Sequence, residues 1–129
     1  MGTFLTPALK SPLGGFSLVN DRTGNAIVTT LEIAVDSATR RKGLLGRDHL
    51  ADTTGIVIAP TNAVHTFFMR FPIDIVFVTR AGRVVKVRES VPARRIAIAL
   101  RAFAVVELAA GCAARRGLRA GDMVSVRPA

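Results

Sequence analysis

The segment AVHTFFMRFPIDIVFV, residues 63–78, places three side chains capable of chemistry among apolar neighbours. His65 could act as a general base or a metal ligand, because neutral imidazole does either near physiological pH. Arg70 could hold a carboxylate or phosphate through its planar guanidinium group. Asp74 lies within IDIVFV, where an unpaired carboxylate would be costly, so it needs a compensating partner.

Each of these residues also has a purely structural interpretation. His65 could hydrogen-bond to the backbone, and Asp74 could be compensated by a cluster of backbone amides. The other possible partners of Asp74 are three arginines, Arg47, Arg70 and Arg88. Glu107, in VVELAAG, poses the same problem on another strand. If Asp74 and Glu107 faced one cavity, they could share a proton as an acid and base pair.

The sequence predicts no metal site and no cofactor. A metal site would need two or three more ligands around His65, and the only other histidine is His49, in a charged context. The single cysteine, Cys112, cannot form an internal disulfide. Arg115 and Arg116 follow it near a helix start, a setting that can lower a thiol pKa. With no histidine nearby, Cys112 is not predicted to be a nucleophile.

Five apolar side chains around the candidate site have two interpretations. They could line a ligand pocket, but side chains of this type more often form the core, and we favour the core. The five are Phe67, Phe68, Met69, Phe71 and Phe77.

The elements that must position these residues are mostly strands. Alternating or continuous apolar runs bounded by Gly, Pro or turn residues predict strands at 27–35, 55–60, 63–69, 73–79 and 83–91. One or two more are expected within 95–111, where IAIALRAF alone could also be helical, and a last one within 117–126. Asp36 or Ser37 can cap a short helix near 38–46, and another helical turn is expected near 112–117. Gly82 suits the left-handed position of a hairpin loop.

We therefore predict a mainly β fold, at the margin of the α+β class. The architecture expected is a single small antiparallel β-sandwich or partly open barrel with one or two short helices. Residues 1–24 are expected to be a loosely ordered N-terminal arm, and residues 25–129 a single β-rich domain.

The charge of the chain favours acidic partners. The sequence has 18 Lys and Arg against nine Asp and Glu, a net charge of +9. Such a surface attracts anionic small molecules and acidic polymers. Nucleic acid is disfavoured, because no run of five basic residues occurs and Tyr and Trp are absent. With no apolar run of membrane-spanning length and no signal-like start, the chain is expected in the cytoplasm.

Several motifs occur in a fixed order along the chain: RKGLLGRDHL, GIVI, HTFFMRFPIDIVFV, AGRVVKV and VVELAAGCAARRGLRAGDMV. Together they resemble a prokaryotic family known as domain of unknown function 192, over residues 31–127. This chain is similar to a shorter branch with His-Thr before the aromatic-Met motif. The resemblance implies a compact, mainly β domain with small helical pieces. It implies no activity and no catalytic residue.

The function that we favour is that of a non-catalytic binding module for a small or polymeric anionic ligand, such as a phosphate, carboxylate or acidic sugar. Its candidate site has His65 and Arg70 near the rim, with Arg47, Asp74 and Glu107 as buried polar support. One alternative is a hydrolase or lyase that uses His65 with Asp74 or Glu107. Another is an accessory protein that binds an acidic partner or nucleic acid through its arginine-rich surface.

Overall fold

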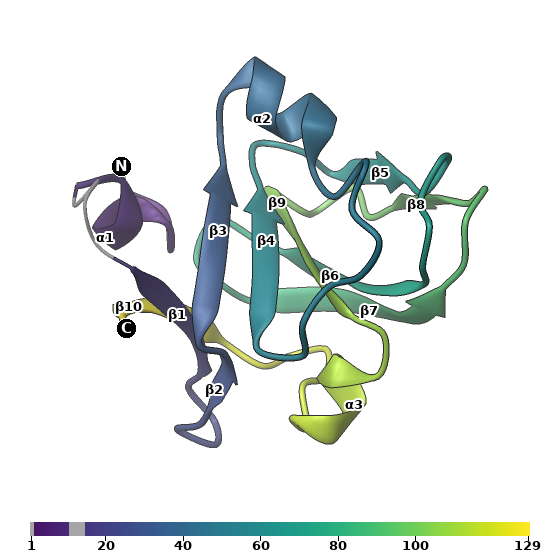
Figure 1. The fold of residues 1–129 in the computed structure, drawn as a ribbon. Helices are drawn as coiled ribbons and strands as arrows, with labels where there is room; N and C mark the ends of the chain where they lie inside the picture. The colour runs from purple at the N-terminus through teal and green to yellow at the C-terminus, as the bar shows by residue number, and fades with distance from the viewer. Residues whose placement is uncertain (1, 11–14) are drawn as a thin grey trace.

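The computed structural model describes residues 2–10 and 15–129, which form ten strands and three short helices (Figure 1). The helices are α1 (Thr6–Leu9), α2 (Ser37–Lys42) and α3 (Cys112–Arg115). The strands are β1 (Phe16–Asn20), β2 (Ala26–Val28), β3 (Thr30–Ala34), β4 (Thr54–Ile58), β5 (Ala63–His65), β6 (Ile73–Val78), β7 (Val84–Val91), β8 (Ile96–Ile98), β9 (Ala104–Ala109) and β10 (Val124–Pro128).

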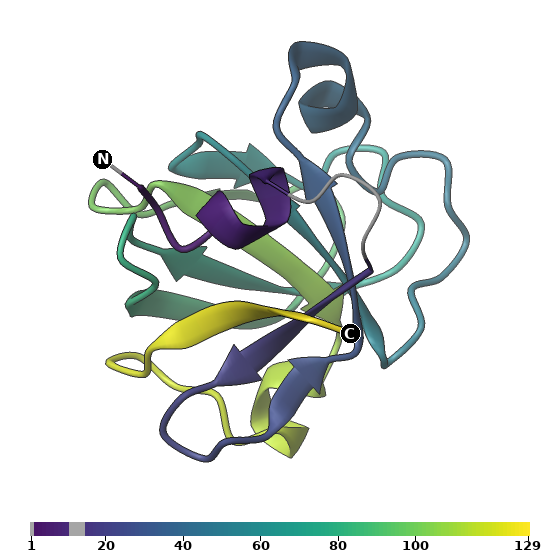
Figure 2. The same ribbon diagram turned by 90° about the vertical axis from the view of Figure 1, so that its left-hand side faces the viewer.

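The strands form two packed sheets and a separate ribbon. A five-stranded sheet has the order β3-β4-β9-β6-β7, and a three-stranded sheet has the order β10-β1-β2. Strands β5 and β8 pair only with each other, as a two-stranded ribbon. Figure 1 shows this ribbon on the side of the molecule away from both chain termini, and Figure 2 shows the terminal side, with β1 and β10 in front. The mainly β, sandwich-like prediction is confirmed.

The central strands β6 and β9 of the five-stranded sheet are covered on both faces, which explains why they are apolar apart from Asp74 and Glu107. Every residue of β6 is buried. One apolar cluster, which includes Leu18, Val76 and Val106, fills the space toward the three-stranded sheet. A second cluster, which includes Ile75 and Ala97, lies on the other face, toward the ribbon and α2. Strands β6 and β9, which lie between the two clusters, therefore have no solvent-facing side.

Three details differ from the sequence-based expectations. Strands β3 and β4 pair in parallel, whereas all the other strand pairs in the described residues are antiparallel. The strand predicted at 27–35 breaks at Thr29 into β2 and β3, which belong to different sheets. The strand predicted at 63–69 ends at His65, because a turn begins at Thr66.

The N-terminal segment is more ordered than predicted. Residues 6–9 form α1, and β1 pairs with β10 along five residues, so Phe16–Asn20 is part of a sheet and not of a loose arm. The prediction failed because the partner strand of β1 lies about a hundred residues further along the chain, and a local pattern does not reveal it. Residues 1 and 11–14 of the predicted arm lie outside the described residues.

Local signals did place the turns and the short helices. Asp36 caps α2 by accepting a hydrogen bond from the Thr39 N–H at 2.8 Å, and Gly43 follows the helix. Gly82 has φ +98°, and a Cβ there would lie 2.5 Å from the Val124 carbonyl oxygen, so the hairpin requires glycine. None of the helices in the described part of the chain is long and apolar enough to cross a membrane.

Candidate functional site

Strand register separates the two buried carboxyl groups that the sequence analysis singled out. On the paired strands β6 and β9, Asp74 lies opposite Leu108 and Glu107 lies opposite Ile75. Because successive side chains of a strand point to opposite faces, Asp74 and Glu107 face opposite sides of the sheet. Asp74 lies on the Leu108 side, in contact with α3, and Glu107 lies on the Ile75 side, toward the ribbon. The hypothesis of a proton shared between them is therefore wrong.

The carboxylate of Asp74 is held entirely by backbone amides. The residue is fully buried, and it accepts hydrogen bonds from the N–H groups of Ser90, Gly111 and Ala113 at 2.8, 3.1 and 2.9 Å. These donors come from the end of β7 and the start of α3, so one side chain ties three segments together. Of the partners considered for Asp74, the structure thus selects the amide cluster and not an arginine.

The predicted arginines are occupied elsewhere. Arg47 makes a bidentate pair with Glu32, with distances of 2.8 and 2.6 Å, and this contact lowers the pKa of the Glu32 carboxyl. Arg70 is exposed and pairs with Asp48 at 2.7 Å. Neither arginine lines the cavity described below. Their positions do not support a direct contact between either guanidinium group and a ligand in that cavity.

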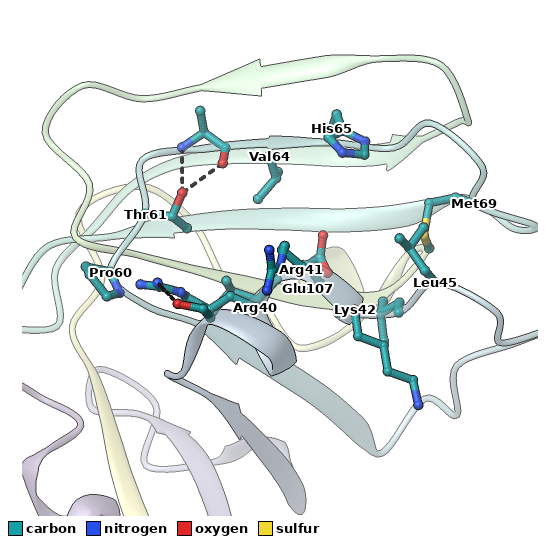
Figure 3. A pocket seen from close by; sticks show the side chains of 15 residues that line it. Arg40, Arg41, Lys42, Leu45, Pro60, Thr61, Val64, His65, Met69 and Glu107 are labelled. Atoms are coloured by element: carbon teal, nitrogen blue, oxygen red, sulfur yellow. Dashed lines mark hydrogen bonds between the residues drawn. The ribbon is translucent and has the colours of Figure 1, made fainter.

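His65 and Glu107 do lie around one cavity, between α2 and the ribbon. Its volume is about 580 Å³, within the range of small-molecule sites. The apolar wall is formed by Leu44, Leu45, Ile58, Pro60, Val64 and Met69. The polar and charged side chains are Ser37, Arg40, Arg41, Lys42, Thr61, His65 and Glu107. We call this space the α2–β5 cavity. In Figure 3, Pro60 and Thr61 mark one end and Leu45 and Met69 the other.

Glu107 has an unusual environment for a buried carboxyl group. The residue is only 5% exposed, yet its side chain makes no hydrogen bond or ion pair with any described residue. Burial alone raises its pKa from the usual value of 4.5 to about 7. No fully buried side-chain oxygen or nitrogen of the described residues lacks a partner, so the Glu107 oxygens must reach the accessible space of the cavity.

Gly43 keeps the approach to Glu107 open. It follows α2 directly, and its backbone has φ +44°, in the region that favours glycine. A Cβ at this position would lie 3.8 Å from Oε1 of Glu107 and 3.6 Å from Cδ1 of Ile58. A longer side chain there would cover the carboxyl group. Gly43, which terminates the helix from the next position, thus also leaves Glu107 accessible from the cavity.

His65 is exposed at the edge of the cavity, on the ribbon. Its ring lies 5.6 Å from that of Phe67, centroid to centroid, at a tilted angle. The basic residues of α2 line the cavity from the opposite element, although the Lys42 ammonium group points away from Glu107 (Figure 3). The sequence analysis missed Arg40, Arg41 and Gly43 as site residues. The signal for them was a basic run followed by glycine, which we interpreted only as a weak helix and its end.

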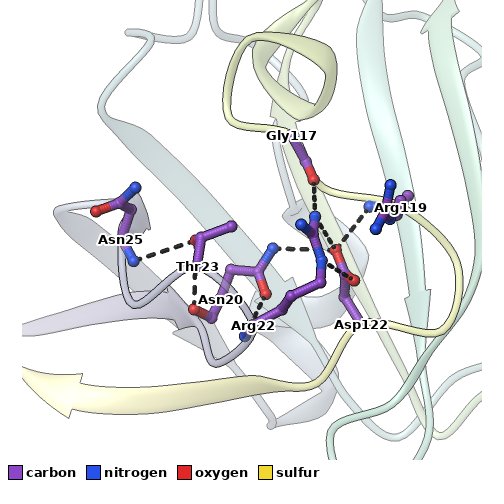
Figure 4. Close-up of polar contacts among 7 residues, drawn as sticks. All are labelled: Asn20, Arg22, Thr23, Asn25, Gly117, Arg119 and Asp122. Atoms are coloured by element: carbon purple, nitrogen blue, oxygen red, sulfur yellow. Dashed lines mark hydrogen bonds and ion pairs between the residues drawn. The ribbon is translucent and has the colours of Figure 1, made fainter.

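A second polar cluster, around Asp122, is structural. Asp122 accepts hydrogen bonds from Arg22 Nε, Asn20 Nδ2 and the Arg119 N–H at 2.7, 3.0 and 3.0 Å (Figure 4). The Arg22 hydrogen bond is the main reason that the pKa of the Asp122 carboxyl is low, at about 2. Arg22 also donates to the Gly117 carbonyl at 2.6 Å. The cluster locks the turn after β1 against the loop after α3.

Cys112 is an apolar core residue and not a reactive thiol. It is fully buried, and its Sγ lies 3.7 Å from the carbonyl oxygens of Ile27 and Asp52. Burial raises the pKa of the thiol, opposite to the effect expected from the nearby arginines. Arg115 and Arg116 pair with Asp52, so their charges are largely compensated.

Comparison with known proteins gives a family and a fold but no activity. The model of the family DUF192, described as "Uncharacterized ACR", matches residues 18–126. No match was found among curated proteins.

Two solved structures are similar to this chain. One is a Sinorhizobium meliloti 1021 protein described as "a putative transcription regulator", with TM-score 0.76 and 23% identity, covering 88% of this chain and 92% of that one. The other is a protein of unknown function from Novosphingobium aromaticivorans DSM 12444, with TM-score 0.73 and 27% identity, covering 86% of this chain and 83% of that one. At these identities, the likeness establishes the fold.

We expect Asp74→Asn to lower the free energy of unfolding by about 2 kcal/mol or more, because its NH2 group would face backbone N–H donors. Urea unfolding followed by circular dichroism measures the change. Asp48→Asn is the matched control, because it removes only the exposed ion pair with Arg70 and should have a much smaller effect. Equal effects of the two substitutions would contradict the role assigned to Asp74.

We expect Glu107→Gln to change how stability depends on pH. Because the folded pKa of about 7 exceeds the ordinary value of 4.5, the native carboxyl contributes stability that is fully present below about pH 4.5 and lost as the pH rises through about 7. Above that window, Glu107→Gln should be more stable than the native protein by about 3 kcal/mol. Urea unfolding across the pH range tests this, and parallel pH profiles for the two proteins would contradict it.

Proposed function

We propose that this chain, which belongs to the DUF192 family, is a non-catalytic binding protein for a small anionic ligand that occupies the α2–β5 cavity. The observation that carries the proposal is the Glu107 carboxyl group, which is 5% exposed, has no hydrogen-bond or ion-pair partner among the described residues, and lines a cavity bordered by the basic residues of α2. A buried polar group without a protein partner is costly unless something else satisfies it.

The cavity also indicates the chemical class of the ligand. Arg40 and Arg41 form no ion pair within the described residues, so their guanidinium groups are available for a carboxylate or phosphate. The wall formed by Leu44, Val64 and Met69 suits an apolar body. A ligand with an anionic group, an apolar part and an oxygen acceptor would match the α2 arginines, the apolar wall and Glu107, respectively.

The protonation of Glu107 would then be coupled to binding. A charged carboxylate would repel an anionic ligand, whereas a protonated carboxyl can donate a hydrogen bond to a ligand oxygen. Because the pKa of Glu107 is about 7, both forms are present near neutral pH. Binding of an anion should therefore take up a proton and weaken as the pH rises above about 7.

A second candidate is acid and base catalysis by His65 and Glu107. It is supported by the fact that both residues border the α2–β5 cavity and that the pKa of Glu107 is about 7, but the His65 side chain lies on the outward face of the ribbon that Ile96 occupies. Asp74 has no part in it, because it faces the opposite side of the sheet. Turnover of a bound phosphate or carboxylate ester, lost in His65→Ala with folding intact, would favour this candidate over simple binding.

Nucleic acid binding has less support. The S. meliloti protein described as "a putative transcription regulator" shares 23% identity with this chain, which supports a common fold and not a common partner. Arg22, Arg47 and Arg70 are paired with carboxylates and are not free for phosphates. Salt-dependent binding to duplex DNA would support nucleic acid binding as the function.

We expect the double substitution Arg40→Ala and Arg41→Ala to weaken binding of the anionic ligand by at least about tenfold, because charge-assisted hydrogen bonds are lost. A calorimetric screen of nucleoside phosphates, sugar phosphates, aromatic carboxylates and acidic sugars at low salt identifies the ligand and measures its affinity. Arg83→Ala with Arg119→Ala is the control, because these exposed arginines do not line the cavity.

The pH dependence of the same titration is the sharper test. The native protein should lose affinity above about pH 7, and Glu107→Gln should not. The proposal would be contradicted if no anion in the screen binds. It would also be contradicted if neither Arg40→Ala with Arg41→Ala nor Glu107→Gln changes the affinity for the ligand that does bind.

A further inference from the structure

Exposed apolar side chains are concentrated on the β5–β8 ribbon and the loops beside it. They are Phe67 (39% exposed), Phe68 (84%), Ile96 (62%), Ile98 (48%) and Leu100 (84%). In the described part of the chain, the only other exposed large apolar residues are Leu9 (55%) and Val35 (38%). We call these five residues the ribbon face. Exposed apolar side chains that gather on one part of a surface mark an interaction site.

The orientation of the ribbon face is fixed by strand pairing. Ile96 lies opposite His65, and Ile98 lies opposite Ala63. The residues between them, Val64 and Ala97, belong to the apolar cluster beneath the ribbon. Since successive side chains of a strand alternate between faces, packing of the inner pair holds Ile96 and Ile98 outward. Their exposure is a property of the fold and not of one side-chain rotamer.

Phe68 is held outward by a tightly anchored turn. Its backbone has φ +69°, in the left-handed region that side chains rarely adopt. The turn is fixed by Thr66, whose hydroxyl donates to the Pro92 carbonyl at 2.7 Å and accepts from the Arg95 N–H at 2.9 Å. The Thr66 N–H also donates to the Arg95 carbonyl at 2.9 Å. The surrounding structure thus stabilises a strained residue whose ring points into solvent.

The segments that form the ribbon face are rich in basic residues. Residues 60–73 and 91–106 contain no Asp or Glu and four arginines, Arg70, Arg94, Arg95 and Arg101. All four are exposed, and only Arg70 pairs with a carboxylate within the described residues. The surface therefore combines protruding apolar groups with a basic border. An anionic partner with an apolar interior complements both features.

We propose that the ribbon face docks on an anionic lipid surface. None of its five side chains lines the α2–β5 cavity, and the two most exposed, Phe68 and Leu100, lie beyond opposite ends of the ribbon. Separate protruding tips fit a deformable apolar medium better than a protein partner, which requires shape complementarity. The arginines would contact lipid phosphates while the apolar tips enter the boundary between headgroups and acyl chains.

The absence of Trp and Tyr from the sequence allows a direct test with the full chain. Phe68→Trp places a single fluorophore on the ribbon face, and Leu9→Trp places one on α1, on the side of the molecule near both termini (Figure 1). The probes are phosphatidylcholine vesicles with and without phosphatidylglycerol. With anionic vesicles, the emission of Phe68→Trp should shift to shorter wavelength and be quenched by brominated acyl chains, while Leu9→Trp should show neither effect.

Further substitutions separate docking from general attraction by the net charge. Phe68→Ala with Leu100→Ala should lower the vesicle partition coefficient at least about tenfold. Arg94→Ala with Arg101→Ala should lower it about fivefold per arginine, and more than Arg83→Ala with Arg119→Ala. Circular dichroism confirms that these exposed substitutions leave the fold intact.

Three outcomes would overturn the proposal. The first is that the native protein does not partition into anionic vesicles. The second is that the two pairs of arginine substitutions lower the partition coefficient equally. The third is that the emission of Phe68→Trp shifts with an acidic amphipathic peptide but not with vesicles. The last would assign the face to a protein partner. Vesicle binding does not depend on the α2–β5 cavity, so Glu107→Gln should partition as the native protein does.

Discussion

Strands β6 and β9 are covered on both faces, and this constraint decides the role of each polar side chain that they carry. A carboxyl group on either strand must find donors within the protein or become protonated. Asp74 on β6 accepts hydrogen bonds from three backbone amides. Glu107 on β9 has no partner among the residues that the structure describes, and burial raises its pKa to about 7. The same covered sheet therefore uses one carboxyl group to hold the fold and leaves the other at a cavity.

The basic residues divide in a similar way. Arg22, Arg47 and Arg115 pair with carboxylates that belong to distant segments, and these pairs fix loops and strand ends. Arg41 on α2 and Arg94 beside the ribbon, in contrast, have no carboxylate partner in the described part of the chain. Net charge is thus a poor guide to where this chain would bind an anion, and the pairing pattern is a better one.

The sequence predicts the elements better than their arrangement. Alternation and turn residues are local, and they predicted the strand at 73–79, the Gly82 turn and the Asp36 cap. The parallel pairing of β3 with β4 and the pairing of β1 with β10 are non-local, and no local pattern encodes them. The placement of Asp74 and Glu107 depends on register, because a shift of one residue would exchange the faces that they occupy.

Attraction and selection are carried by different features of this molecule. A net charge of +9 acts on any anion within about a Debye length, roughly 8 Å at physiological salt, and is screened beyond it. It therefore raises encounter rates without distinguishing ligands. Discrimination requires a group that is costly to leave unsatisfied, and Glu107 is such a group because it is buried and has no partner in the part of the chain that the structure describes. An anion that cannot accept a hydrogen bond from this carboxyl would be attracted to the α2–β5 cavity without being retained there.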